Sequence, residues 1–559
     1  METTTHMAEE ATNEAILFST PFGYLLPIAA HRPECLLEPS HRTVEGLCAL
    51  GDAMADTATS EKPAEEDKDK CCCPEPTVDG PLPKSDSDIP SIFTYFGQFI
   101  DHDLTIRTDQ DTTVSVIKDK DRIQPVDPKK VAADLLNGRR PFLDLDSVYG
   151  DGPSLVENIK GLRPSHTESD KLYDSDLLLK ENPINKAGGL DIPRVGIDGL
   201  IADERNNENT IISQIQAAMI AFHNKVAGNV PGSSDAEKFV KARQLVRWTY
   251  QYVVVHQYLT AVCDPNIVYD TLLNGPRLYG PGSGRPLYMP LEFSAAGFRF
   301  GHSMIRPFYN LNATAAEIAN GTKETKNVMD LLLPSQNSLN FADGAIKPEL
   351  QIKWENFLEG GANKARKIDP FIARDLFDLP ESTRMLSDIL RHLARSNLLR
   401  GYSLSLPTAQ AVAKAFGISA LSGIDLVRET ETAPNGKPSG MKDILRDYGF
   451  TERTPLWFYL LVEAKAHHGG NRLGELGSRL ICETIIGVLK ADPNSYLNNC
   501  CHGDLKDAFG PYSASENQGG RPSGGVKLPG RSKAVGSIEA ILDYTGIAKF
   551  PDPAPASAS

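Results

Sequence analysis

Three polar side chains stand in an otherwise apolar segment, SIFTYFGQFIDHDLT (residues 91–105), at a spacing that could support proton-transfer chemistry. Gln98, Asp101 and His102 follow one another at positions i, i+3 and i+4, so they share one face of a helix. Such groups on an apolar helix are unfavourable unless each finds a partner. A neutral imidazole can accept and return a proton near neutral pH, which makes His102 a candidate base. The alternative is a buried polar cluster whose members satisfy one another.

Two further segments carry polar residues that are ambiguous in isolation. Arg205 and Glu208 stand three apart in DERNNEN, a spacing that is ordinarily a surface salt bridge. His302, in EFSAAGFRFGHSMIRP, could be a core histidine or a metal ligand. A ligand histidine needs an acceptor for its other ring nitrogen, and Asn397 in LARSNLLRGYS could supply one.

The elements that must position these residues are predicted to be helices. Apolar residues recur near the helical period in the segments around 91–105, 213–228, 234–263 and 477–492. Ser234 and Glu237 have the spacing of a capping box at the start of the third segment. Strand-like alternation is scarce, so we predict a mainly α fold, a large single domain with little β structure.

A change in composition divides the chain. Residues 56–88 are rich in charge, proline and serine and nearly lack large apolar residues, which predicts a mobile acidic loop. We expect residues 1–55 to form an N-terminal extension that packs on the core. Residues 89–548 should form one large domain, and residues 549–559 a disordered tail.

The formal net charge of -15 disfavours nucleic acids and anionic membranes as partners, because phosphate groups would be repelled. The N-terminal residues lack the basic start and uninterrupted apolar core of a secretory signal, so we expect no membrane span and a cytoplasmic location. Export by a route without such a signal stays open. The 9 cysteines are unlike a disulfide framework, and the adjacent Cys71–Cys73 give poor tetrahedral metal geometry.

Together and in this order, the motifs resemble those of the animal-type haem peroxidases, in the peroxidase–cyclooxygenase superfamily, and particularly its bacterial branch. The resemblance rests on FTYFGQFIDHDLT, LDLDSVYG, ADERNNENTIISQIQAAMIAFHNKVA, FRFGHSMIRP, LARSNLLRGYSLSLP and LWFYLLVEAKAHHGGNRLGELGSRL. It implies that residues 89–548 form a haem peroxidase catalytic domain that binds haem b.

The resemblance also implies roles on both sides of the haem. His102 matches the distal catalytic base, and Arg205 matches the arginine that stabilises negative charge on the departing oxygen. Gln98 matches the amide that orients water, peroxide or a halide. His302 matches the proximal iron ligand, and Asn397 matches the residue that accepts its other N–H.

Further matches concern the haem periphery. Arg299 is a candidate partner for a haem propionate. Asp101 and Glu208 match the two carboxylates that form ester bonds to haem methyl groups in this family. Relatives that oxidise chloride have methionine after that glutamate, whereas this chain has Asn209. A sulfonium link is therefore impossible and efficient chloride oxidation is not expected, which leaves bromide, iodide, thiocyanate or phenols as donors.

A calcium site is implied as well. The candidate ligands are Asp103, Asp144, Asp146 and the carbonyl oxygen of Phe142, because carboxylate and carbonyl oxygens suit a hard cation. The family usually has a threonine hydroxyl where Arg140 stands, so one ligand is lost or replaced. A plain acidic turn is the alternative.

The resemblance implies an enzyme that reduces hydrogen peroxide and oxidises a small donor through an oxo-ferryl intermediate. One alternative is a haem fatty-acid dioxygenase of the same superfamily. Such enzymes need a tyrosine three residues before the proximal histidine, where this chain has Arg299, followed by Phe300. Another alternative is a catalytically idle haem-binding protein, although the residues matched to the distal and proximal sides are all present. Catalase-like activity, the physiological donor and the oligomeric state are not predicted.

Overall fold

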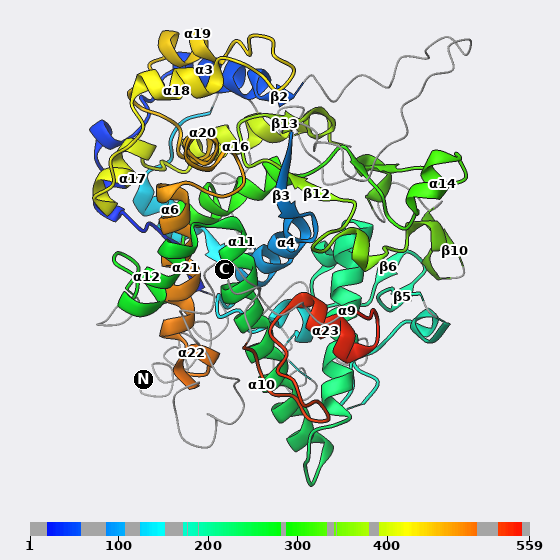
Figure 1. The fold of residues 1–559 in the computed structure, drawn as a ribbon. Helices are drawn as coiled ribbons and strands as arrows, with labels where there is room; N and C mark the ends of the chain where they lie inside the picture. The colour runs from blue at the N-terminus through cyan, green and yellow to red at the C-terminus, as the bar shows by residue number, and fades with distance from the viewer. Residues whose placement is uncertain are drawn as a thin grey trace, which may run out of the picture.

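The structure is a computed structural model that describes residues 20–56, 85–106, 123–150, 152, 172–175, 177–187, 189–280, 287–332, 340–342, 344–379, 391–499 and 524–550. Helices dominate these residues (Figure 1). A single cluster of buried apolar side chains runs from Phe22 to Leu542. The predicted mainly α, single-domain fold is therefore confirmed for the described part of the chain.

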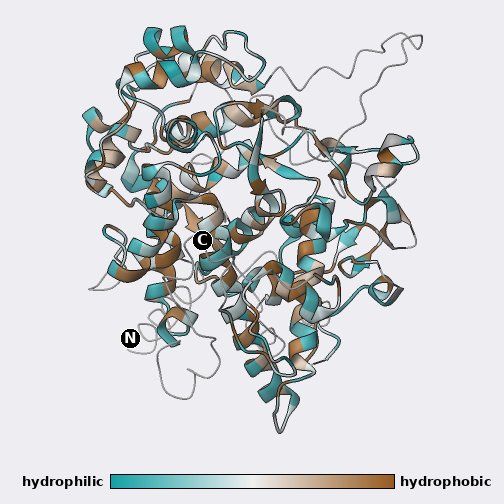
Figure 2. Cartoon of the chain, viewed as in Figure 1, coloured by the Kyte–Doolittle hydropathy of each residue, from teal (hydrophilic) through white to brown (hydrophobic). Residues whose placement is uncertain are grey.

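The described α-helices are α2 (Pro27–Ala30), α3 (His41–Ala53), α4 (Ile92–Leu104), α6 (Pro128–Asp134), α7 (Asp146–Tyr149), α9 (Thr210–Ala227), α10 (Asp235–Val253), α11 (Thr260–Val262), α12 (Pro265–Asn274), α13 (Leu291–Ser294), α14 (Ala315–Ala319), α16 (Leu393–Ser403), α17 (Ala409–Phe416), α18 (Gly423–Thr430), α19 (Met441–Asp447), α20 (Leu456–His468), α21 (Glu475–Ala491), α22 (Tyr496–Asn499) and α23 (Ile538–Thr545). Two 3-10 helices matter for the site, η6 (Glu204–Asn207) and η8 (Gly297–Met304). In Figure 2 the helices show hydrophobic and hydrophilic residues on different sides, as expected when one face of each helix is buried.

The strands of the described residues are short. They are β1 (Thr20–Gly23), β2 (Ala55–Asp56), β3 (Asp86–Pro90), β4 (Leu136–Asn137), β5 (Arg194–Val195), β6 (Asp198–Gly199), β7 (Met289–Pro290), β8 (Phe308–Tyr309), β9 (Lys326–Asn327), β10 (Phe341–Ala342), β11 (Ala345–Ile346), β12 (Lys364–Arg366) and β13 (Ile372–Ala373). β1 pairs antiparallel with β4 and parallel with β7, and the remaining strands form two-stranded pairs. These ladders fasten loops to one another and build no sheet layer.

The predicted long helix around 234–263 is continuous but changes its pitch. α10 passes into a π-helical turn, η7 (Val254–Leu259), and then into α11. The Ser234 hydroxyl accepts a hydrogen bond from the Glu237 backbone N–H at 3.2 Å, which confirms the predicted N-cap. The Glu237 carboxylate instead accepts from the Ser233 backbone N–H at 2.8 Å, so the second half of the capping box is displaced by one residue.

Residues 20–55 lie against the core. β1 joins two ladders, α3 packs on α16, and the Glu292 carboxylate accepts from the Leu25 and Leu26 backbone N–H groups at 2.8 and 3.0 Å. The Glu292 side chain is fully buried. A buried carboxylate with two backbone donors ties the N-terminal segment firmly to the helical body.

Both ends of the predicted loop 56–88 are ordered. Asp56 lies in β2, is fully buried and pairs with Arg366 at 2.7 Å. Residues 86–88 lie in β3, which pairs with β12. The composition rule failed at these ends because ladder hydrogen bonds and a buried ion pair compensate for the missing apolar residues. Residues 57–84, including Cys71–Cys73, lie outside the described residues.

The C-terminal boundary also differs slightly. Phe550, in the predicted tail 549–559, packs on the core, while residues 551–559 lie outside the described residues. None of the described helices has the length and apolar composition that a bilayer crossing requires.

α4 lies at the centre of the molecule and is surrounded by other helices (Figure 1). It packs against α9, η7, η8 and η6. Eleven of its residues, from Ile92 to Leu104, are buried, so α4 is an internal helix with apolar neighbours on most sides. A polar side chain on such a helix must face a cavity or a polar partner.

Candidate functional site

A cavity of about 280 Å³ adjoins α4 and collects most of the residues singled out in the sequence. Its polar wall consists of Gln98, Asp101, His102, Glu208, Asn209, Arg299 and His302. Its apolar wall consists of Phe298, Ile305, Val328, Met329, Leu331, Leu332, Leu376, Leu379 and Leu393. Arg205 and Asn397 do not line the cavity themselves, but each contacts a histidine that does.

Gly97 sets how closely α4 approaches its neighbour η7. A Cβ atom added at Gly97 would lie 2.5 Å from the Tyr258 hydroxyl oxygen, which is far too close for any contact. Tyr258 is buried and lines the cavity beside α4. Because Gly97 has no side chain, Tyr258 can pack against α4 and form part of the cavity wall.

His102 is buried, and one of its ring nitrogens is engaged. Nδ1 lies 2.8 Å from Asn206 Oδ1, and Asn206 Nδ2 donates to Gln216 Oε1 at 2.9 Å. Because Asn206 presents its oxygen, Nδ1 carries the proton and Nε2 keeps its lone pair. Burial and the nearby Arg205 charge lower the His102 pKa to about 3, so the imidazole is neutral at physiological pH. A neutral ring with a free Nε2 lone pair is suited to accept a proton.

Arg205 is clamped by Asp203. Its Nε donates to Asp203 Oδ1 at 3.0 Å and its Nη2 to Asp203 Oδ2 at 2.6 Å, which is bidentate geometry. Nη2 also donates to the His102 carbonyl oxygen at 3.0 Å. The arginine charge holds the pKa of the buried Asp203 carboxyl well below its usual range. Arg205 therefore supplies a fixed positive charge next to His102.

Gln98 is held between two residues that follow η6. Its Nε2 donates to Glu208 Oε2 at 2.9 Å, and its Oε1 accepts from Asn209 Nδ2 at 3.2 Å. Asn209 Oδ1 caps α9 by accepting from the Ile211 and Ile212 backbone N–H groups. Asn209 thus caps the start of α9 and orients the Gln98 amide with the same side chain.

The two carboxylates predicted to form ester bonds both line the cavity but differ in environment. Asp101 accepts from the Thr105 hydroxyl at 3.1 Å, and burial raises its pKa against the opposing charges of Arg205 and Arg299. Glu208 is more exposed and is bound by Gln98. A group bound in the cavity would therefore lie beside both carboxylates.

His302 and Arg299 both lie on η8, and both line the cavity. Asn397 contacts His302 as predicted, but with the opposite end of its amide: Nδ2 lies 2.8 Å from His302 Nδ1. The reason is Arg299, whose Nη1 donates to Asn397 Oδ1 at 3.1 Å and occupies the oxygen. Iron ligation through His302 Nε2 requires a protonated Nδ1 and hence the opposite amide orientation, which would also release Arg299.

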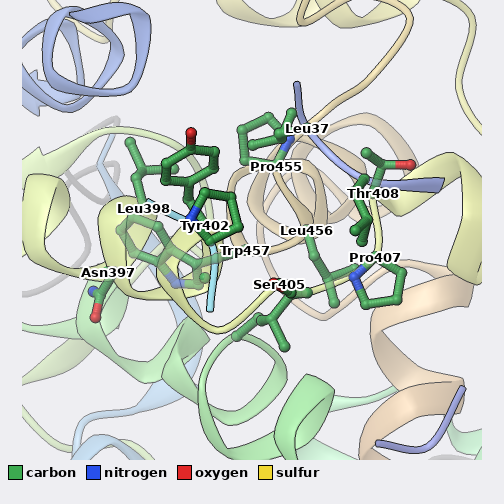
Figure 3. A pocket seen from close by; sticks show the side chains of 15 residues that line it. Leu37, Asn397, Leu398, Tyr402, Ser405, Pro407, Thr408, Pro455, Leu456 and Trp457 are labelled. Carbon is green, nitrogen blue, oxygen red and sulfur yellow. The ribbon is translucent and has the colours of Figure 1, made fainter. Parts of the chain in front are cut away.

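Helix α20 packs on η8, which carries Arg299 and His302, and α16 packs on α20. Trp457 Nε1 donates to the Arg299 carbonyl oxygen at 3.1 Å. Asn397, Tyr402 and Leu456 are among the residues that line a void of about 20 Å³ (Figure 3). Such a void holds about one water molecule. Burial and the Arg299 charge lower the His302 pKa to about 3, so its ring is neutral and able to bind a metal.

The predicted calcium ligands Asp103, Asp144 and Asp146 come together, with oxygen atoms within 4.8 Å of one another. Two of their buried oxygens, Asp144 Oδ1 and Asp146 Oδ1, have no hydrogen-bond partner. Burial and the neighbouring aspartates raise the Asp103 pKa, and burial raises that of Asp146 to about 6. Asp146 Oδ1 does lie 3.4 Å from the Arg139 guanidinium, whereas buried carboxylate oxygens without hydrogen bonds, such as Asp144 Oδ1, fit a hard cation.

The loop that carries this cluster has a strained backbone. Leu143 and Leu145 adopt the left-handed region, with φ of 52° and 60°, which side chains other than glycine rarely occupy. The Phe142 carbonyl oxygen already accepts from Gln251 Nε2 at 3.1 Å and has one further lone pair to offer. Arg140, at the predicted threonine position, pairs with Asp144 at 3.3 Å and supplies no ligand oxygen.

Sequence reasoning missed the residues that support the site from behind. Asp203, Asn206 and Gln216 have no distinguishing spacing, and each acts through a contact made only in the folded chain. The one available signal was composition: the polar run DERNNEN contains η6, and the structure buries Asn206 and Asn207 within it.

Comparison with known proteins identifies the family. The animal haem peroxidase family model matches residues 109–499, a span that contains Arg205, His302 and Asn397, while α4 precedes it. Human thyroid peroxidase is 27% identical over 190 residues, which cover 31% of this chain and 20% of that protein. The chain thus spans only a small part of the length of this relative.

Two solved structures resemble the whole fold. Peroxidase A from Dictyostelium discoideum is 15% identical and superposes with a TM-score of 0.51. The match covers 96% of this chain and 95% of the peroxidase A chain. The fatty acid alpha-dioxygenase from Arabidopsis thaliana also has a TM-score of 0.51 and 15% identity, covering 82% of this chain and 71% of its own. At this identity the likeness shows the fold alone.

Proposed function

Because the chain belongs to the animal haem peroxidase family, we propose that it is a haem-dependent peroxidase that reduces hydrogen peroxide and oxidises a small donor. The observation that carries the proposal is the cavity itself, which is lined by His102 with a free Nε2 lone pair and by a second neutral histidine, His302. The motifs that precede and follow the cavity residues support the bacterial branch of the family.

The residues of the cavity fit a haem. His302 Nε2 would bind the iron, Arg299 would meet a propionate, and the apolar wall would cover the macrocycle. When bound, haem supplies the redox-active iron at which peroxide is cleaved. Asp101 and Glu208 are the candidates for ester links to its methyl groups, and the acidic cluster is the candidate calcium site.

The chain's own residues handle the proton and the charge. His102 Nε2 accepts the proton of the incoming peroxide and returns it to the departing oxygen. Arg205 stabilises the negative charge that develops on that oxygen, and Asp203 prevents the guanidinium from turning away. Asn209 fixes the Gln98 amide in place of a sulfonium link, which supports bromide, iodide, thiocyanate or phenols as donors rather than chloride.

Stopped-flow absorption of the haem-loaded protein with one equivalent of peroxide tests the proposal. We expect a rapid spectral change that a donor such as iodide or a phenol reverses, and a rate about 10²–10⁴-fold lower in His102→Ala. The exposed His467 provides a matched control, because His467→Ala should react like the unaltered protein. Failure to take up haem would reject the proposal entirely.

A second candidate function is a fatty-acid dioxygenase. Its support is the fold likeness to the alpha-dioxygenase and the presence of two tyrosines, Tyr95 and Tyr258, in the cavity wall. Oxygen uptake on addition of a fatty acid, lost in Tyr258→Phe or Tyr95→Phe, would favour it. Haem uptake and a peroxide reaction without such oxygen uptake would favour the peroxidase.

A further inference from the structure

A buried chain of ion pairs runs from the acidic cluster to the distal arginine. Arg139 Nη1 lies 3.4 Å from Asp146 Oδ1, and Arg139 Nη2 donates to Asp203 Oδ2. The side chains of Arg139, Asp146 and Asp203 are 6%, 2% and 0% exposed. Water and salt therefore screen these pairs little, and a change at one pair is felt at the next.

Asp203 is the shared member of this chain. The same Oδ2 atom accepts from Arg139 and from Arg205, the latter at 2.6 Å. The Asp203 Oδ1 atom accepts from the Arg205 Nε and from the Arg205 backbone N–H, both at 3.0 Å. Because both arginines bind the same carboxylate oxygen, we expect that losing one of them strengthens the interaction of the other with Asp203.

Asp146 is shared in the same way at the other end. Its Oδ1 atom lies 3.4 Å from Arg139 Nη1, and its carboxylate also belongs to the cluster with Asp103 and Asp144. A cation in the cluster and the Arg139 guanidinium therefore compete for Asp146. Arg139 stands between two acidic partners, and the occupancy of each end sets how much of its charge is available to the other.

We propose that Arg139 and Asp203 are positioning residues that couple the cation site to the distal arginine, so that the occupancy of the cluster and the hold on Arg205 depend on each other. The proposal extends the proposed function, since Arg205 acts on peroxide only in a haem-loaded protein. The coupling itself needs neither haem nor peroxide and is reciprocal by thermodynamic necessity. It connects Arg205 with a cluster that it does not contact.

A double-mutant cycle read out by Ca²⁺ binding tests the coupling. In Arg205→Gln, Asp203 loses one partner and draws Arg139 away from Asp146, so Ca²⁺ binds more tightly, by about fivefold to tenfold. In an Arg139→Gln background the connection is cut, and Arg205→Gln should leave the Ca²⁺ dissociation constant unchanged. The constants are measured by calorimetry on the full-length chain.

The neighbouring arginine provides the matched control. Arg140→Gln removes the same charge from the adjacent residue, which pairs with Asp144 at 3.3 Å. In that background Arg205→Gln should still tighten Ca²⁺ binding. An equal gain in the Arg139→Gln and Arg140→Gln backgrounds would mean a direct long-range charge effect and would overturn the proposal, as would the absence of any gain in Arg205→Gln.

A second measurement addresses the distal side of the haem-loaded protein. Asp203→Asn is expected to slow the reaction with peroxide about tenfold, and Asp203→Glu to restore part of the rate, because only a carboxylate clamps the guanidinium. An unchanged rate in Asp203→Asn would overturn the positioning role. A wild-type protein that takes up haem without reacting with peroxide would instead contradict the proposed function, while the Ca²⁺ cycle would still decide the coupling.

Discussion

The two sides of the cavity, which we propose to be the distal and proximal sides of a haem, are built in different ways. On the distal side, His102 is tied through Asn206 to Gln216, and Arg205 is tied through Asp203 to Arg139. On the proximal side, the described hydrogen bond of the His302 side chain goes to Asn397 alone.

The two sides differ in how far their side chains are already arranged before a cofactor binds. The groups around His102 already have the protonation and orientation that the proposed peroxide chemistry needs, since His102 is neutral and its Nε2 is free. Proximal groups satisfy one another instead, with Arg299 holding the oxygen of Asn397. If the proposed function holds, a preorganised distal side and a proximal side completed by its ligand would place the rearrangement cost in cofactor binding and not in turnover.

The largest expected effect separates the two sides directly. His302→Ala should weaken haem binding by more than about 100-fold, because loss of an outer partner alone costs about 10–100-fold. His102→Ala should leave haem affinity nearly unchanged. Spectroscopic haem titration of both variants measures this, and similar losses in the two would contradict the division of roles.

The next effect concerns the support behind the proximal side. Glu463 on α20 is buried, and it accepts from the Leu476 and Gly477 backbone N–H groups at 3.0 and 3.1 Å. Burial raises its pKa from 4.5 to about 7. The native state therefore binds this proton more tightly than the unfolded state, and its contribution to stability is lost as pH rises from about 4.5 to 7.

In Glu463→Gln this loss should disappear. Urea unfolding at several pH values should show that the free energy of unfolding of the unaltered protein falls, relative to the variant, by about 3 kcal/mol across that range. Glu452, which is exposed, provides the control, since Glu452→Gln should keep the pH dependence. A parallel pH profile for Glu463→Gln would rule out the assignment.

The smallest expected effect tests the hydrogen bond between His102 and Asn206 on the distal side. Asn206→Leu leaves the His102 Nδ1–H without its acceptor, which should slow the peroxide reaction on the order of 10- to 100-fold. The adjacent buried Asn207 accepts from Arg194 Nη1 at 2.7 Å and does not contact His102, so Asn207→Leu is the matched control. Equal rates in the two variants would show that the tautomer is set by some other contact.

The sequence predicted the cavity residues well because α4 carries them at helical spacing. Gln98, Asp101 and His102 line one cavity because residues three and four apart share a helix face. The amide orientation of Asn397 could not be predicted, since it depends on where Arg299 lies in three dimensions.

Pairings between distant segments could not be predicted from the sequence either. β2 and β13 are two residues long and carry no alternation that could be recognised, yet they order Asp56 at the edge of a segment that reads as a loop. The pairing of Asp203 with two arginines could not be predicted for the same reason, because Arg139 lies far from Asp203 in the sequence. Local sequence patterns predict helices, whereas these contacts form only in the folded chain.

The two left-handed leucines in the acidic loop have a practical consequence for engineering. Leu143 and Leu145 hold the loop in a backbone conformation that costs on the order of 1–3 kcal/mol each. Glycine would adopt the same conformation without strain and would also make the unfolded chain more flexible. A chain with glycine at both positions would therefore form this loop with less backbone strain, but it would lose more conformational entropy on folding and hold the three aspartates less rigidly.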